Sequence, residues 1–303
     1  MFINLHLHSQ YSVFDGTIEI DKLAEYLKDK APGCAITDHG VMHGCVKFYK
    51  IFKKAGLKPI LGSEMYITSV DKGTPYDKIP NKQSAKEERG IAKERYHIIL
   101  LAKNNEGYSN LCRIVSEGHL RGYYYKPRID LEVLKKYKEG IVVTSACIFG
   151  EVSNLLIKSV TEQEGEYYLK AKEVTKKFLD IFGDDYYLEV QDNGAKEQYI
   201  ANPLISQLGE ELSIPIVATS DSHYLKKEDI KTFALGMKMQ TYDSAKKKSS
   251  YEVDMNMKLW VKTEEDFISE LSIKKEYCDN TELVFNKCNV SLPLGTLKFP
   301  EVA

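Results

Sequence analysis

The stretch FINLHLHSQYSVFDG, residues 2–16, places two histidines, His6 and His8, in an otherwise apolar segment. Residues i and i+2 of a β-strand point to the same face, so a strand over 2–8 would project both imidazoles side by side from its end. This geometry is typical of a metal clamp. Two unrelated surface histidines explain an isolated pair equally well, because a short motif needs structural context. The other strands of the chain decide between these interpretations.

Apolar strand patterns alternate with amphipathic helix patterns along the chain. Strands are predicted at 2–8, 33–39, 58–67, 95–103, 140–147, 185–191 and 214–223. The alternation predicts an α/β protein with a largely parallel sheet, and the number of units favours a closed barrel over an open, doubly wound sheet. No GxGxxG motif or P-loop motif follows a predicted strand, which leaves a nucleotide-binding site of either kind without support. The predicted fold class is therefore a seven-stranded β/α barrel.

The composition excludes several classes of protein. With 43% hydrophobic and 28% charged residues, the chain of 303 residues is typical of a globular protein. No apolar run approaches membrane-spanning length, no signal-peptide pattern precedes the first strand, and the 6 cysteines show no CxxC spacing. We therefore expect a soluble cytoplasmic protein with reduced thiols. The formal net charge of -2 argues against bulk attraction to nucleic acid, although a local basic groove or bound cations would still receive a phosphate backbone.

Ionisable side chains recur where the predicted strands end, which is where β/α barrels carry their chemistry. At or near these ends lie His6, His8, Asp38, His39, Glu64, Cys147, Asp221 and His223, whereas His97 lies near the start of its strand. Any one of them alone would more often be a satisfied core residue than a ligand. Several such groups in one barrel mouth, however, would repel or stay unpaired unless cations neutralised them. The pattern predicts a polynuclear metal site, whose imidazoles, carboxylates and thiolate suit zinc best and manganese or iron as alternatives.

Other segments carry weaker patterns. The segment GYYYKPRID, residues 122–130, either contacts nucleic acid through its aromatic and basic side chains or packs as a loop under the barrel. Residues 71–94 show little hydrophobic periodicity and are predicted to form a mobile surface insertion. One long helix is predicted over 161–182, and the lysine run 246–248 is interpreted as a solvated loop.

The motifs HLHSQYSVFDG, AITDHG, GSE, YHIILLAKN, GYYYKPRID, TSAC and ATSDSHY, in this order, resemble those of the polymerase and histidinol phosphatase (PHP) domain of bacterial DNA polymerase III alpha subunits. The resemblance covers essentially the whole chain. It implies a distorted, TIM-barrel-like β/α barrel over 1–235, with a surface insertion at about 69–94, and a small C-terminal extension, 236–303, that leads toward a polymerase palm domain missing from this chain.

The same resemblance implies nine metal ligands and a reaction. The ligands are His6, His8, Glu64 and Asp221 for one ion, the bridging Glu64 with His97 and Cys147 for a second, and Asp15, His39 and His223 for a third. Because His97 belongs to this set, its place at a strand start is interpreted as a misplaced strand boundary. Such a trinuclear centre suits phosphoester hydrolysis. The implied activity is 3′ to 5′ exonuclease proofreading of a DNA primer terminus during replication, with no polymerase active site in this chain.

The implied partners and two alternatives complete the sequence-based expectations. The partners are the primer terminus, the polymerase domains of the same subunit and an exonuclease subunit, with no membrane. The first alternative is a catalytically silent domain that supports the polymerase and docks a separate exonuclease; the complete ligand set argues against a silent centre. The second is a small-molecule phosphatase like histidinol phosphatase, which gives no role to residues 122–130 or to the C-terminal segment.

Overall fold

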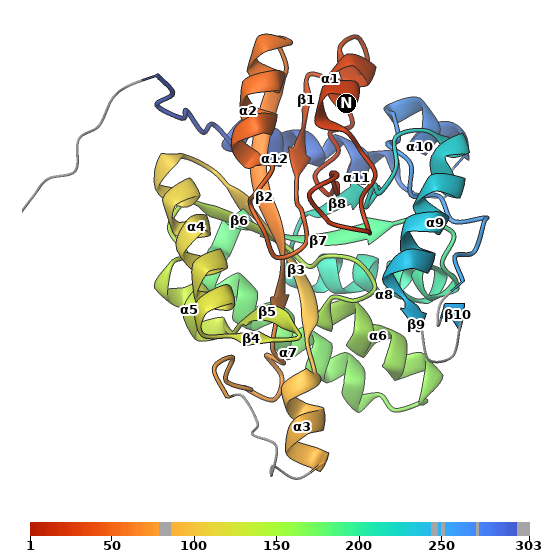
Figure 1. Cartoon of the computed structure of the whole chain (residues 1–303). Coiled ribbons are helices and arrows are strands. Elements are labelled where there is room, and N and C mark those ends of the chain that lie inside the picture. Colours follow the sequence, from red (N-terminus) through yellow and green to blue (C-terminus); the bar gives the residue numbers. More distant parts are fainter. Residues whose placement is uncertain (79–85, 244–247, 250–251, 271–272, 296–303) are drawn as a thin grey trace, which may run out of the picture.

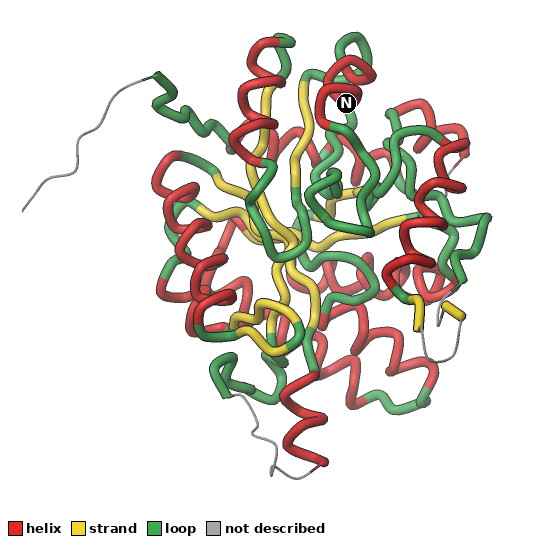
Figure 2. Tube along the Cα trace, in the orientation of Figure 1, coloured by secondary structure: helices red, strands yellow, loops and turns green. Residues whose placement is uncertain are grey.

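The computed structural model describes residues 1–78, 86–243, 248–249, 252–270 and 273–295. A curled sheet lies at the centre and helices surround it (Figure 1, Figure 2). Its strands follow the order β4-β5-β2-β3-β6-β7-β8, with β1 paired to β2. The strands are β1 (Gly33–Ile36), β2 (Lys58–Ile67), β3 (Tyr96–Ala102), β4 (Tyr123–Tyr124), β5 (Lys126–Ile129), β6 (Ile141–Thr144), β7 (Tyr186–Gln191) and β8 (Ile216–Thr219), while β9 (Tyr242–Asp243) and β10 (Lys248–Ser249) pair separately.

Several helices, among them α2, α4 and α8, pack against the sheet. In α1, the buried residues Ile20, Leu23, Ala24 and Leu27 follow the i, i+3, i+4, i+7 spacing of a single helical face. None of the helices that the structure describes has the length and apolar character of a membrane span. The α-helices are α1 (Ile20–Leu27), α2 (Cys45–Lys54), α3 (Lys86–Lys93), α4 (Asn105–Leu120), α5 (Leu131–Lys136), α6 (Glu151–Thr161), α7 (Glu166–Phe182), α8 (Lys196–Leu212), α9 (Ile230–Gln240), α10 (Glu264–Glu270), α11 (Lys275–Asp279) and α12 (Thr281–Lys287).

The N-terminal segment 2–8 closes the sheet into a distorted barrel. The His8 backbone N–H donates to the Ser222 carbonyl at 2.8 Å, and the Thr37 N–H donates to the Leu7 carbonyl at 2.9 Å. The segment therefore lies between β1 and the end of β8. Together with β1, β2, β3, β6, β7 and β8 it forms the seven-membered wall of the barrel, and the predicted fold class is confirmed. Leu7 forms only an isolated bridge, with Ser222, so the strand predicted over 2–8 is an extended segment and not a regular strand.

The strand β3 runs antiparallel to both of its neighbours, β2 and β6. This strand departs from the predicted largely parallel sheet, in which β1–β2, β2–β5, β6–β7 and β7–β8 are parallel pairs. Ile67 at the end of β2 pairs with Tyr96 at the start of β3, so the chain returns to the barrel at the end where it left. His97 consequently lies at the mouth although it begins its strand. The strand direction explains this position, and a misplaced boundary does not.

Local predictions also differ from the structure in three places. The helix predicted over 161–182 begins only at Glu166, as α7, because Gln163 adopts a left-handed φ of 57° and separates it from α6, which ends at Thr161. Helix α3 occupies part of the stretch predicted as an irregular insertion, whose residues 79–85 lie outside the described residues. The segment 122–130 forms the hairpin β4–β5, whose second strand pairs with the end of β2. The hairpin depends on a pairing with β2 that a local pattern does not contain.

The C-terminal segment packs into the barrel end opposite the mouth. Val284 and Cys288, in and just after α12, join the inner apolar cluster that contains Ile3 and Leu5. The Ile3 backbone N–H donates to Thr281 Oγ1 at 2.8 Å, and this hydrogen bond connects α12 to the N-terminal segment 2–8. A domain division after residue 235 stays a prediction. Residues 246–247 of the lysine run and the terminal residues 296–303 lie outside the described residues.

Lys262 is a buried cation in this segment, only 2% exposed. Burial lowers the pKa of its ammonium from 10.5 to about 7, although the charges of Asp221, Asp192 and Asp266 oppose the shift. Below pH 7 the folded and unfolded chains are both protonated here, and the folded chain bears the full desolvation cost. Between pH 7 and 10.5 the unfolded chain binds more protons at this site, so the contribution of Lys262 to the free energy of unfolding rises with pH.

The variant Lys262→Met should lack this rise. We expect the free energy of unfolding of the wild type, minus that of the variant, to increase by on the order of 4 kcal/mol between pH 6.5 and pH 10. Chemical denaturation of both proteins at the two pH values measures this difference. A difference that does not change with pH would show that Lys262 titrates alike in the folded and unfolded chains.

Candidate metal centre

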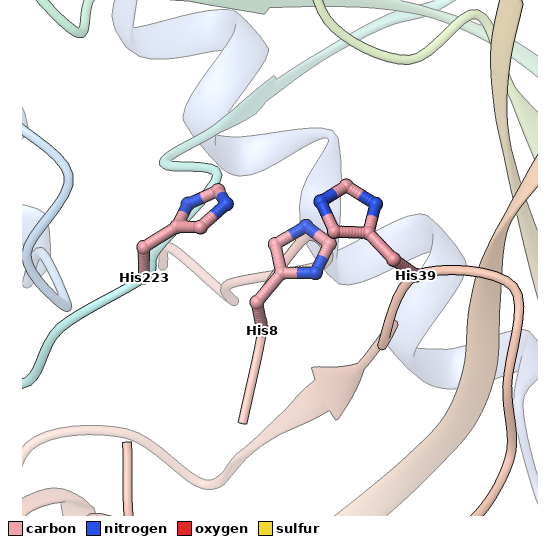
Figure 3. Close-up of side chains that lie close together, drawn as sticks. All are labelled: His8, His39 and His223. Atoms are coloured by element: carbon pink, nitrogen blue, oxygen red, sulfur yellow. The ribbon is translucent and has the colours of Figure 1, made fainter. Parts of the chain in front are cut away.

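Histidine side chains from three separate segments meet at the barrel mouth (Figure 3). His8 comes from the N-terminal segment 2–8, His39 from the turn after β1, and His223 from the segment after β8. The ring centroids of His8 and His39 are 4.1 Å apart, and those of His8 and His223 are 4.4 Å apart. The two-residue spacing of His6 and His8 does place both imidazoles on one side, because their Nε2 atoms are 3.1 Å apart.

Glu64, near the end of β2, is the central acidic residue of this group and is 1% exposed. Its Oε1 atom lies 3.3 Å from His6 Nε2 and 2.9 Å from His97 Nδ1. Its Oε2 atom lies 3.4 Å from His8 Nε2 and 2.6 Å from His39 Nδ1. One carboxylate therefore reaches four imidazoles, and this is the arrangement expected of a bridging ligand.

Two aspartates flank Glu64. Asp221 Oδ1 lies 3.1 Å from His6 Nε2 and 3.3 Å from His8 Nε2, whereas Asp15 Oδ2 lies 2.5 Å from His39 Nε2 and 3.6 Å from His223 Nε2. Asp221 has a φ of 45°, in the left-handed region where side chains other than glycine are strained. Strain of this kind gathers at functional sites, where the surrounding structure holds a side chain in one position.

Cys147 supplies the only thiol among the predicted ligands. Its Sγ atom lies 3.7 Å from His97 Nδ1 and 3.9 Å from Glu64 Oε1. The preceding residue, Ala146, also adopts a left-handed φ, of 61°, so the chain turns sharply after β6 as it presents the thiol. The other cysteines, all free, lie elsewhere in the fold.

The nine predicted ligands form one connected set of contacts around Glu64. Within it, three subsets bring three ligand atoms within 4.8 Å of one another: His6, His8 and Asp221; His39, Glu64 and His97; and His8, His39 and His223. The first lies inside the set expected for one ion. The other two divide the ligands differently from the expected sets, because His39 contacts both Glu64 and Asp15.

The polar atoms of the cluster fit cations. Three buried side-chain atoms, His39 Nδ1, Glu64 Oε2 and Asp221 Oδ1, make no hydrogen bond of regular geometry, although His39 Nδ1 and Glu64 Oε2 are 2.6 Å apart and Asp221 Oδ1 lies 3.1 Å from His6 Nε2. Buried polar atoms are almost always paired, so three such atoms in one cluster point to a missing positive partner. Burial lowers the pKa of the His8 imidazole to about 3, which keeps the ring in the neutral form that binds metals. Imidazole, carboxylate and thiolate together suit zinc.

The sequence model of the PHP domain family matches residues 4–193 of the chain. The chain belongs to the PHP domain family. It is 37% identical over 290 residues to DNA polymerase III subunit alpha of Borreliella burgdorferi, an alignment that covers 95% of this chain and 24% of the relative. DNA polymerase III subunit alpha of Deinococcus radiodurans is 36% identical over 302 residues, with 97% of this chain and 21% of the relative covered. This PHP domain thus spans about a quarter or less of these relatives.

The PHP domain contains a buried acid that the sequence analysis missed. Glu189 in β7 is 2% exposed, and its Oε1 atom accepts from His6 Nδ1 at 2.8 Å and from Thr219 Oγ1 at 2.5 Å. This contact fixes the proton of His6 on Nδ1 and turns the Nε2 lone pair toward Glu64 and Asp221. Carboxylates behind metal-binding histidines have this role in other proteins. An acid inside the buried strand YYLEVQ was the available signal.

Asp38 supports the PHP domain's ligands from behind. The sequence analysis placed it among the strand-end residues, and the structure directs its carboxylate toward the turn after His8. It accepts from the Ser9 backbone N–H at 2.7 Å and from Ser12 Oγ at 3.0 Å. Ser12 Oγ in turn lies 3.1 Å from His8 Nδ1. Asp38 and Ser12 therefore orient His8 in the way that Glu189 orients His6.

A pocket of about 590 Å³ opens over the cluster, within the usual size of ligand sites. Seven of the nine predicted ligands line it, all except His6 and His8. Its lining includes the basic residues Lys93, Arg95 and Lys126 and the apolar residues Phe149, Phe233, Met237, Met257 and Leu259. The PHP domain thus combines a candidate metal centre with an adjoining space for a substrate.

Proposed function

We propose that this PHP domain is a metal-dependent phosphoesterase that removes nucleotides from the 3′ end of DNA. The observation that carries the proposal is the connected cluster of nine predicted ligands, in which buried carboxylates and imidazoles crowd around Glu64. Burial of charged groups costs much free energy unless cations compensate their charge. The relatives named DNA polymerase III subunit alpha support DNA as the substrate, and proofreading is the role that we propose for the activity.

The mechanism assigns a task to each group of residues. Bound divalent cations, zinc in our proposal, supply Lewis-acid activation of water and neutralise phosphate charge. We assign His6, His8, Glu64 and Asp221 to one ion, Glu64, His97 and Cys147 to a second, and Asp15, His39 and His223 to a third. Glu64 joins the first two sets and fixes their spacing. Glu189 and Asp38 hold His6 and His8 in orientation, and the apolar residues that line the pocket limit the access of water.

The setting of this activity is also a proposal. We infer that the chain acts as part of a DNA polymerase III alpha subunit in cytoplasmic DNA replication, where the polymerase domains deliver the primer terminus. The share of the relatives that the chain covers, about a quarter or less, supports its role as one domain of a larger protein. An exonuclease subunit is a further proposed partner. Nucleotide polymerisation is not expected of this chain alone.

Removal of the metal should abolish the activity. We expect the purified chain, loaded with zinc or manganese, to shorten a 5′-labelled primer from its 3′ end, and we expect no shortening after chelation until the metal is restored. The variant Asp221→Asn, prepared identically, controls for a contaminating nuclease. Rapid turnover of histidinol phosphate without primer shortening would indicate a small-molecule phosphatase instead. Stoichiometric metal binding with neither reaction would indicate a structural domain.

A further inference from the structure

Three cations line the pocket without an acidic partner. Lys93, Arg95 and Lys126 form no ion pair with any carboxylate that the structure describes, and Arg95 Nη1 donates only to the Lys93 carbonyl, at 3.1 Å. The neighbouring acid, Glu94, is engaged by Lys72 Nζ at 2.8 Å and by the Tyr96 hydroxyl at 2.9 Å. We call Lys93, Arg95 and Lys126 the basic rim. Its charge is available to an anion that enters the pocket.

Tyr66 connects the basic rim to the candidate metal centre. Its ring, in a residue 4% exposed, has its centroid 5.3 Å from Lys126 Nζ and 5.9 Å from the Arg95 guanidinium. The same ring lies 5.2 Å from the ring of His97. An anion on the rim would therefore be separated from the metal ligands by about one aromatic ring. The contacts with Tyr66 also restrict the two long side chains, which reduces the entropy lost when they bind.

Phe149 gives the same pocket an exposed aromatic surface. The side chain follows Cys147 in the turn after β6, is 61% exposed, and has its ring 5.5 Å from that of His97. Aromatic rings beside a basic groove bind single-stranded nucleic acids, because every base can stack on them while the cations follow the backbone. The buried Phe233 and Leu259 are further apolar residues in the lining of the pocket.

We infer that the basic rim and Phe149 form a strand-binding subsite for single-stranded nucleic acid, with a backbone phosphate on Arg95 and Lys126 and a base stacked on Phe149. The inference rests on the proposed function, since it takes the metal centre as the position of the scissile phosphate. A small phosphate monoester has one phosphate, which the metal centre would take, and would leave the rim unpaired. A strand supplies a second phosphate for the rim and a base for the aromatic ring.

Binding of a strand that resists hydrolysis tests the subsite. We would measure fluorescence anisotropy of a phosphorothioate-linked, single-stranded oligonucleotide with the full, metal-loaded chain at several salt concentrations. The double variant Arg95→Gln/Lys126→Gln should bind on the order of 10-fold more weakly, and its plot of log affinity against log salt should be shallower by about 0.7, the value for one phosphate contact on a single strand. The matched control Lys28→Gln/Lys54→Gln removes two exposed charges away from the pocket and should bind like the wild type.

Phe149→Ala should separate stacking from charge. We expect a loss of affinity of about 5- to 100-fold with an unchanged salt slope, because stacking releases no counterions. Strand affinity that is equal in the rim variant, in Phe149→Ala and in the wild type would overturn the inference. Circular dichroism of each variant excludes unfolding as the cause of weak binding, and Arg95→Lys/Lys126→Arg, which keeps both charges, should retain most of the salt slope.

Hydrolysis of a small diester distinguishes a failure of the strand-binding subsite from a failure of the proposed function. If the wild type hydrolyses bis(p-nitrophenyl) phosphate in a metal-dependent reaction but the rim variant binds strands normally, the subsite is wrong and the phosphoesterase stands. If the wild type hydrolyses neither the diester nor a primer, the phosphoesterase is wrong. Weakened strand binding by the variants then still identifies the pocket as a nucleic-acid site.

Discussion

Glu64→Gln should lose bound metal and lower phosphodiester hydrolysis by about 1000-fold or more. The Glu64 carboxylate contacts four imidazoles and is the proposed bridge between two ions. An amide of the same size removes the bridging charge and presents an N–H donor where a cation would lie. Elemental analysis of the purified variant and the primer-shortening assay measure the two losses. Glu64→Asp, which keeps the charge but shortens its reach, should fall between the variant and the wild type.

The control for this experiment is Glu25→Gln, an exposed acid on α1 that leaves the mouth untouched. It should keep the metal content and the activity of the wild type. Full metal occupancy in Glu64→Gln would contradict the bridging role. Full metal occupancy together with a loss of hydrolysis would show that Glu64 acts in the reaction and is not needed to retain the metal.

Glu189→Gln should weaken metal affinity or activity by about 10- to 100-fold, although the residue touches neither metal nor substrate in our proposal. The Glu189 carboxylate fixes the proton of His6 on Nδ1, at a distance of 2.8 Å. A glutamine amide can donate to Nδ1 instead, which would move the ring proton to Nε2 and remove the lone pair that faces Glu64 and Asp221. Metal titration of the variant measures the affinity.

Nitrogen-15 chemical shifts of His6 distinguish orientation from packing. In the wild type we expect the proton on Nδ1, and in Glu189→Gln a shift toward the other tautomer. Gln has nearly the volume of Glu, so the buried space stays filled and the thermal stability of the metal-free variant should change little compared with its metal affinity. Wild-type affinity in the variant would show that Glu189 only fills space between β6, β7 and β8.

The barrel and much of the site are readable in the sequence because their signals are local. The apolar run 58–67 predicts β2 at its observed bounds, Lys58–Ile67. The ligands at strand ends follow from the same periodicity, and the resemblance adds Asp15 and His97. Strand direction is different, since alternating side chains look alike in both directions. The reversal of β3 therefore needed the pairing of Ile67 with Tyr96.

Glu189 escaped prediction for a related reason. Its partner His6 is 183 residues away, and no local pattern joins them. The start of α7 was also placed too early, because Glu162, Gln163 and Glu164 are compatible with a helix in the sequence. Pocket residues such as Phe149 gain meaning only when the fold brings the turn after β6 beside the loop before β3.

The antiparallel direction of β3 gives the barrel a connection whose length and sequence can change without a change in the sheet. β2 ends and β3 begins at the same end of the barrel, and the connection between them contributes Lys93 and Arg95 to the lining of the pocket. A change in the length of this connection would alter which substrates reach the predicted metal ligands without moving any strand of the barrel. We therefore expect the substrate selectivity to change when this connection is exchanged between relatives, while the barrel and the nine predicted ligands are left in place.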